Sequence, residues 1–194
     1  STTHPPSTTS TTLPSTTSTL PPTTSTSAPT LTLAMLEDRI AAEWPGSVAA
    51  SMWSPPGAWS CTQLTESPSL GLGSVVRCLP AKAAEKEGQH PLLTVLVLDE
   101  FGKTAVAQAG VVYELGESFV ARVGPGKFCR DILGEDGYVG SLPEPDMEYF
   151  AALLYWFMEG RPARMDADNN GIPCETLMPG AVVASVWDGG WVEG

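Results

Sequence analysis

The sequence lacks the features that mark many enzymes and most membrane-spanning proteins. It has only two histidines, His4 and His90, and no G-x-S-x-G, Walker or G-x-G-x-x-G motif. No run of about 18 apolar residues is present, so no segment of this chain reads as a membrane-spanning helix. We therefore predict a protein that is not an enzyme and that has no membrane-spanning segment in this chain.

Basic residues are also scarce, and one stretch has no charge at all. The chain contains 10 Lys and Arg against 22 Asp and Glu, for a net charge of −12. This balance argues against a nucleic-acid partner and suits a cation. Residues 1–30 contain no charged side chain and are almost wholly Ser, Thr and Pro. Such a segment buries too little apolar surface to fold, so we predict a disordered stalk over 1–30.

Four cysteines are present, at Cys61, Cys78, Cys129 and Cys174. None has the C-x-x-C spacing of a zinc or redox motif. An even number predicts disulfides and therefore an exported protein whose export signal has been removed. Four cysteines allow three pairings, and only the pairing of 61 with 78 and 129 with 174 avoids links between the two halves of the chain. Four buried thiols in a cytosolic protein are the alternative.

The first half of the charged region has the pattern of a small α+β domain, over residues 31–116. Leucine, isoleucine and tryptophan recur at helical spacing between residues 31 and 44, which predicts an amphipathic helix. Apolar segments separated by turn residues then predict antiparallel strands. The expected strands cover residues 58–64, 74–79, 92–98 and 104–115, with a hairpin connection at 99–103.

The second half, residues 127–194, is predicted to be helical. After a link at 116–126 we expect a short helix or turn at 128–133 and a strongly apolar helix that ends near Glu159. Ser141 and Asp146 are its two candidate N-caps. A last helix is expected from Gly180 to Trp187, with Trp187 and Trp191 folding back onto the core.

The most informative stretch lies between these helices. Asp166, Asp168 and Asn170 place oxygen-bearing side chains at alternate positions, and Gly171 then permits a sharp turn. This arrangement is typical of the first half of a calcium loop, in which the carbonyl of Ile172 occupies the seventh position. The twelfth position, which usually provides a bidentate Glu, is a leucine here. The only nearby carboxylate is Glu175, at position ten.

This stretch resembles the excalibur domain, a small extracellular calcium-binding module of bacteria with the pattern D-x-D-x-D/N-G-x-x-C-E. The resemblance covers roughly residues 127–187, and the preceding run at 160–165 is similar to actinobacterial members. It implies that Cys129 pairs with Cys174 and that Ca²⁺ is bound. The expected ligands are the side chains of Asp166, Asp168, Asn170 and Glu175 and the carbonyl of Ile172. Residues 31–116 only loosely resemble small two-cysteine actinobacterial envelope domains.

We therefore expect an exported cell-envelope protein with a non-catalytic calcium-binding module at its C-terminal end. Two alternatives stay open. The first is a surface binding or adhesion module for an envelope protein or glycan, in which the acidic loop is only a structural turn. The second is an envelope hydrolase that uses paired carboxylates among Glu85, Glu87, Asp99 and Glu100.

Overall fold

The computed structural model describes residues 30–43, 58–66, 69–81, 92–109, 117–133, 137, 142 and 144–192. The predicted stalk lies outside the described residues except for Thr30. Both histidines and the candidate residues Glu85, Glu87 and Ser141 also lie outside them, as do residue 44 of the predicted first helix and residues 110–115 of the fourth predicted strand.

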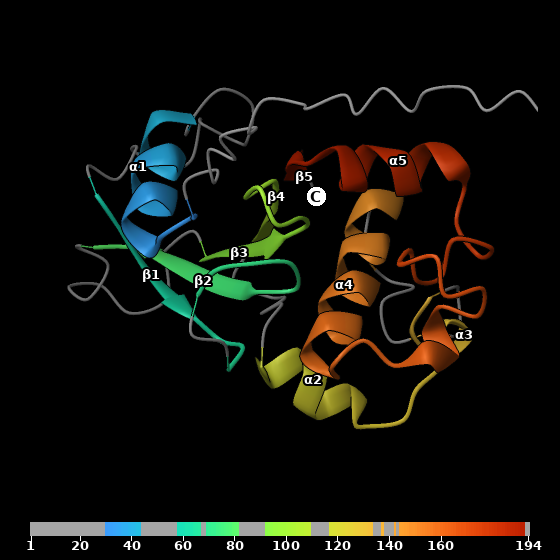
Figure 1. The fold of residues 1–194 in the computed structure, drawn as a ribbon. Coiled ribbons are helices and arrows are strands. Elements are labelled where there is room, and N and C mark those ends of the chain that lie inside the picture. Colours follow the sequence, from blue (N-terminus) through green and yellow to red (C-terminus); the bar gives the residue numbers. More distant parts are fainter. Residues whose placement is uncertain are drawn as a thin grey trace, which may run out of the picture.

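The described residues form an α+β fold around one five-stranded sheet (Figure 1). The strands follow each other in chain order across the sheet: β1 (Trp59–Gln63), β2 (Val75–Pro80), β3 (Leu92–Val97), β4 (Thr104–Ala109) and β5 (Gly190–Val192). The first four strands pair antiparallel, as predicted, but β5 pairs parallel with β4. The expected antiparallel sheet is therefore a mixed sheet. The chain reaches β5 through helices rather than a tight turn, so a parallel pairing is possible.

One face of the sheet is covered by helix α1 (Leu33–Glu43), which confirms the helix predicted at 31–44 (Figure 1). Leu36 and Ile40 from this helix are completely buried against side chains of the first four strands. The Glu37 carboxylate also accepts a 2.7 Å hydrogen bond from the backbone N–H of Cys61 in β1. Since β1 is an edge strand, this bond satisfies a backbone donor on the side of β1 that has no neighbouring strand.

The opposite face is covered by helix α4 (Pro145–Met158), the predicted apolar helix. Almost every side chain from Met147 to Phe157 is buried, so this helix is part of the core, as expected. Burial on both faces explains why β3 is apolar at every position except Thr94. Leu93 and Val95 face the α1 side, whereas Leu96 faces the α4 side.

The remaining helices surround α4. They are α2 (Glu117–Val123), α3 (Cys129–Ile132), the 3₁₀ turn η2 (Ala163–Met165) and α5 (Gly180–Asp188). Helices α3 and α5 confirm the predictions for 128–133 and 180–187. The link expected at 116–126 instead contains α2, because Phe119 and Val123 are one turn apart and both pack into the core. Asp146 does not cap α4 but lies in its first turn, since Pro145 already occupies the first position.

The segments predicted as separate units, 31–116 and 127–194, share one sheet, and both provide side chains to the hydrophobic clusters on its two faces. Strand β5 comes from the C-terminal segment, and Trp191 packs against the cluster beneath α1. Side chains of β2, β3 and β4 pack with those of α4 and α5 on the other face. The second half of the chain is therefore held in place by the sheet that the first half forms.

Both predicted disulfides are present. Cys61 and Cys78 are paired neighbours in β1 and β2, and Cys129 joins Cys174 across 45 residues. No helix among the described residues has both the length and the apolar character needed to cross a membrane.

The attachment of β5 depends on Gly189, which gives a first prediction. Gly189 has φ +82°, and a Cβ there would lie 2.8 Å from the carbonyl oxygen of Thr104 in β4. Gly189→Ala should therefore lower the free energy of unfolding by about 1–3 kcal/mol, measured by urea denaturation.

Gly180→Ala is the matched control, since a Cβ at Gly180 meets no atom within 4 Å and its φ is ordinary. Equal denaturation midpoints for the two variants would contradict the placement of β5 beside β4.

Candidate metal centre

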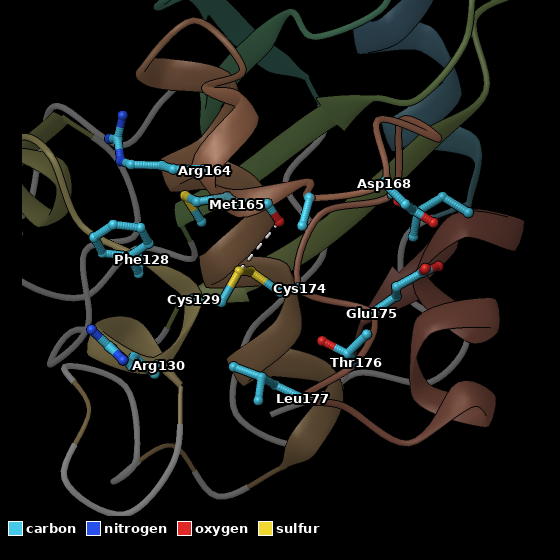
Figure 2. Close-up of a pocket in the computed structure, with 12 residues that line it drawn as sticks. Phe128, Cys129, Arg130, Arg164, Met165, Asp168, Cys174, Glu175, Thr176 and Leu177 are labelled. Atoms are coloured by element: carbon cyan, nitrogen blue, oxygen red, sulfur yellow. Dashed lines mark hydrogen bonds between the residues drawn. A yellow bond between two sulfur atoms is a disulfide. The ribbon is translucent and has the colours of Figure 1, made fainter.

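The two ends of the predicted calcium loop are held by a disulfide and a backbone hydrogen bond. The Cys129–Cys174 disulfide joins α3 to the end of the loop, with a Cα–Cα distance of 5.4 Å. The backbone N–H of Cys174 also donates a 2.8 Å hydrogen bond to the carbonyl of Met165, directly before the loop begins. Figure 2 shows the disulfide beside Met165, in the middle of this part of the molecule. The ends of the loop are therefore held together without any ligand.

Asp166 organises the turn from inside the loop. Its side chain is buried, at 5% exposure, and its two carboxylate oxygens accept the backbone N–H groups of Asn170 at 3.1 Å and Gly171 at 2.9 Å. Gly171 has φ +87°, as the predicted sharp turn requires. Asn169 also adopts a positive φ, of 55°, which asparagine tolerates better than most residues.

Asp168, Asn170 and Glu175 meet at the surface of the loop. The side-chain amide of Asn170 donates one hydrogen bond to Asp168 Oδ2 at 2.9 Å and another to Glu175 Oε1 at 3.1 Å. Its own oxygen, Oδ1, accepts the N–H of Ile172 at 2.7 Å. The carboxylate at position ten therefore reaches the same amide as the carboxylate at position three, although no acidic residue occupies position twelve.

The Asp168 and Glu175 carboxylates are joined by hydrogen bonds from the Asn170 amide, and these groups do not surround a common point. Among the residues that the structure describes, no three His, Cys, Asp or Glu side chains are gathered as they would be around a metal ion. The Asn170 amide instead lies between two carboxylates that would otherwise repel each other. Each carboxylate oxygen has a further lone pair, so the donor set of carboxylate, amide and carbonyl oxygens fits a hard cation such as Ca²⁺.

Tyr149 of α4 supports the loop from below, which the sequence pattern did not indicate. Its hydroxyl donates to the carbonyl of Pro173 at 3.1 Å and accepts the indole N–H of Trp187 at 2.9 Å. Burial raises the pKa of the Tyr149 phenol, and the nearby charges of Glu175 and Asp166 raise it further, against an opposing effect of the Trp187 hydrogen bond. A tyrosine on an otherwise apolar helix face is the only sequence signal for this role.

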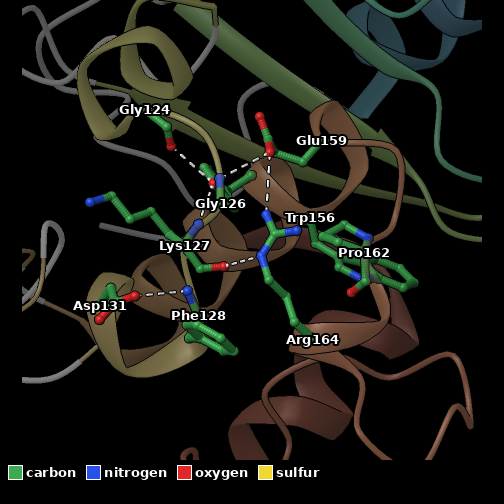
Figure 3. A network of polar contacts seen from close by, with 10 residues as sticks. Gly124, Gly126, Lys127, Phe128, Asp131, Trp156, Glu159, Pro162 and Arg164 are labelled. Carbon is green, nitrogen blue, oxygen red and sulfur yellow. Dashed lines mark hydrogen bonds and ion pairs between the residues drawn. The ribbon is translucent and has the colours of Figure 1, made fainter.

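Arg164 holds the segment before the loop against the segment that carries Cys129 (Figure 3). Its Nε donates to the carbonyl of Lys127 at 2.8 Å, and its Nη2 lies 3.3 Å from Glu159 Oε2 at the end of α4. The hydroxyl of Tyr155 accepts the N–H of Lys127 at 3.0 Å and donates to the carbonyl of Gly124 at 2.9 Å. This network holds the segment before Cys129 against the segment before the loop, independently of the sulfur–sulfur bond.

A scan against protein-family models, a search of curated proteins and a search of solved structures each found no match to this chain. The resemblance to the excalibur domain therefore stays a prediction from the motif.

The raised pKa of Tyr149 predicts how stability depends on alkaline pH. In the unfolded chain the phenol ionises near pH 10, whereas the folded protein retains the proton. This stabilisation is therefore complete below about pH 10 and is lost as the pH rises towards the folded pKa. The free energy of unfolding should begin to fall near pH 10 and should continue to fall up to about pH 12, and Tyr149→Phe should flatten this fall.

At neutral pH the same variant should be less stable by about 1–3 kcal/mol, because the Pro173 carbonyl and the Trp187 indole lose their partner. Parallel stability curves for the two proteins across this pH range would refute the assignment.

Proposed function

We propose that residues 166–175 form a calcium-binding loop in an exported, non-catalytic protein of the bacterial cell envelope. The observation that carries this proposal is the position of Glu175. Its carboxylate shares the Asn170 amide with Asp168, so an acidic residue at position ten can take the role that position twelve usually has. The ligands would be the side chains of Asp166, Asp168, Asn170 and Glu175, with the carbonyl of Ile172.

The chemistry of these groups favours calcium over other metals. Three carboxylates provide negative charge, and all the proposed donors are oxygens, as calcium prefers. Neither histidine is near the loop in the sequence, and Cys174 is used in a disulfide, which disfavours transition metals. Magnesium is disfavoured because it demands a tighter, near-octahedral geometry.

The surroundings of the loop reduce the entropy that is lost on binding. The disulfide, the Cys174 N–H bond to Met165 and the Tyr149 bond to Pro173 all restrict the loop in advance. An affinity on the order of 10⁻⁴–10⁻³ M suffices for an extracellular module. Calcium would then stabilise the fold, because it binds only the folded chain.

Export is supported by the oxidised state of all four cysteines in this fold. Disulfides persist in oxidising compartments and are rare in the cytosol. The resemblance to an extracellular bacterial module points to the same location.

The hydrolase alternative gains no support from the hairpin between β3 and β4. Asp99 Oδ1 accepts the backbone N–H groups of Phe101 at 2.9 Å and Lys103 at 2.8 Å. Both bonds are those of a residue that stabilises a turn, rather than of a carboxylate that faces a substrate. Glu85 and Glu87 lie outside the described residues.

Calorimetric titration with CaCl₂ tests the proposal directly. The wild type should bind one Ca²⁺, and Asp168→Asn and Glu175→Gln should each weaken binding by about tenfold or more, since each removes one ligand charge. Both side chains are at the surface of the loop, so these variants should fold normally. Calcium at about 100 times its Kd should also raise the free energy of unfolding by about 2.7 kcal/mol.

Asp188→Asn serves as the control, because Asp188 is an exposed acid at the end of α5 and takes no part in the loop. A loss of heat in Asp188→Asn equal to that in the loop variants would indicate non-specific attraction by the acidic surface. No binding heat in the wild type at millimolar calcium would refute the proposal.

A further inference from the structure

A groove of about 390 Å³ lies directly beside the loop. It runs between helix α3 and the residues that follow the loop, and the Cys129–Cys174 disulfide lies in its centre (Figure 2). This volume is within the range of pockets that hold small ligands or a few residues of a peptide.

The groove is apolar in the middle and has exposed apolar side chains at its rim. Met165 and the disulfide contribute buried apolar surface to its lining. Phe128 and Leu177, which also line the groove, are 45% and 52% exposed. Large apolar side chains left exposed next to a concave surface are typical of binding sites. A leucine- or phenylalanine-sized side chain is the natural occupant of such a surface.

The two sides of the groove carry opposite charges. Figure 2 shows Arg130 on the same side as Phe128, with Asp168 and Glu175 on the other side. The Arg130 guanidinium lies 5.5 Å from the centre of the Phe128 ring, and its side chain is 79% exposed. Its contact with Asp131 is long, at 3.9 Å, and the Asp131 carboxylate already accepts the N–H of Phe128. Arg130 therefore keeps donors for an incoming carboxylate, in a chain whose net charge is −12.

From this charge complementarity we propose that the groove binds a peptide segment of a partner protein. The segment would carry a large apolar side chain over the disulfide and an aspartate or glutamate next to it, facing Arg130. The apolar contact would provide most of the affinity, and the carboxylate would set the orientation.

Calcium should strengthen this binding, and this part of the inference rests on the proposed function. Asp168 and Glu175 line the groove and repel an acidic peptide as long as their charges are not neutralised. A bound Ca²⁺ would reduce this repulsion. By thermodynamic linkage, the peptide would then raise the affinity for calcium by the same factor.

The test is an NMR titration of the isotope-labelled full chain with acetylated and amidated Gly-Asp-Leu-Phe-Gly. Two matched peptides replace either the Asp with Asn or the Leu-Phe pair with Ser-Ser. We expect the Asp peptide, Gly-Asp-Leu-Phe-Gly, to shift the amide signals of Phe128, Arg130 and Leu177. The Asn peptide should bind about threefold more weakly, as expected for a partly exposed ion pair, and the Ser-Ser peptide should not bind measurably.

Two variants test the groove itself. Arg130→Gln should remove the difference between the Asp and Asn peptides, and Leu177→Ser should weaken both. Both side chains are largely exposed, so the fold should be unaffected. Arg122→Gln is the control, since Arg122 is an exposed arginine on α2 that does not line the groove.

The titrations above are carried out in CaCl₂. Repeating them in EDTA measures the calcium dependence, and the Asp peptide should bind about threefold more weakly in EDTA than in CaCl₂. Equal affinity in calcium and EDTA would overturn the coupling alone, while calorimetry with calcium decides the proposed function separately. The groove proposal is overturned if these three signals do not shift with the Asp peptide in either buffer. It is also overturned if they respond only to vesicles of anionic phospholipid, which would indicate a membrane surface as the ligand.

Discussion

The Cys129–Cys174 disulfide is the constraint on which the functional part of this molecule depends. It fixes the end of the acidic loop to α3, 45 residues earlier in the chain. Because the backbone N–H of Cys174 also donates a hydrogen bond to the carbonyl of Met165, the two ends of the loop have almost no freedom to separate. The buried Asp166 then has a fixed position from which to bind the N–H groups of the turn. A loop of ten residues with three acidic side chains would otherwise extend to separate its charges.

Helix α4 connects this constraint to the rest of the fold. One side of the helix packs on the sheet, and Tyr149 on the helix contacts the loop through Pro173. The sheet includes β5, which follows α5 and therefore anchors the chain after the loop. The loop is thus held before, beneath and after its acidic residues. This arrangement explains how an acidic turn can keep its shape in a protein that already carries a large negative charge.

Much of the fold could be predicted from spacing in the sequence. The stripe that contains Leu36 and Ile40 indicated α1, and the continuous apolar run at 92–98 indicated a central strand. The strand β5 could not be found in this way, because Gly190–Val192 is too short to show a period and gains its bonds only from β4. Helix α2 was missed for a similar reason, since its apolar residues have meaning only against the core that they cover.

The sequence by itself determined the local chemistry of the loop: alternating oxygen-bearing side chains, a glycine at the turn and a cysteine near its end. These features follow from residue types at fixed spacing and need no distant partner. Only the tertiary structure decided that Glu175 reaches the Asn170 amide, that Tyr149 supports Pro173, and that Phe128 and Leu177 flank one groove. The last two of these features bring together segments whose approach depends on how α3, α4 and the sheet pack. Packing of this kind depends on the whole core, so it cannot be read from the loop alone.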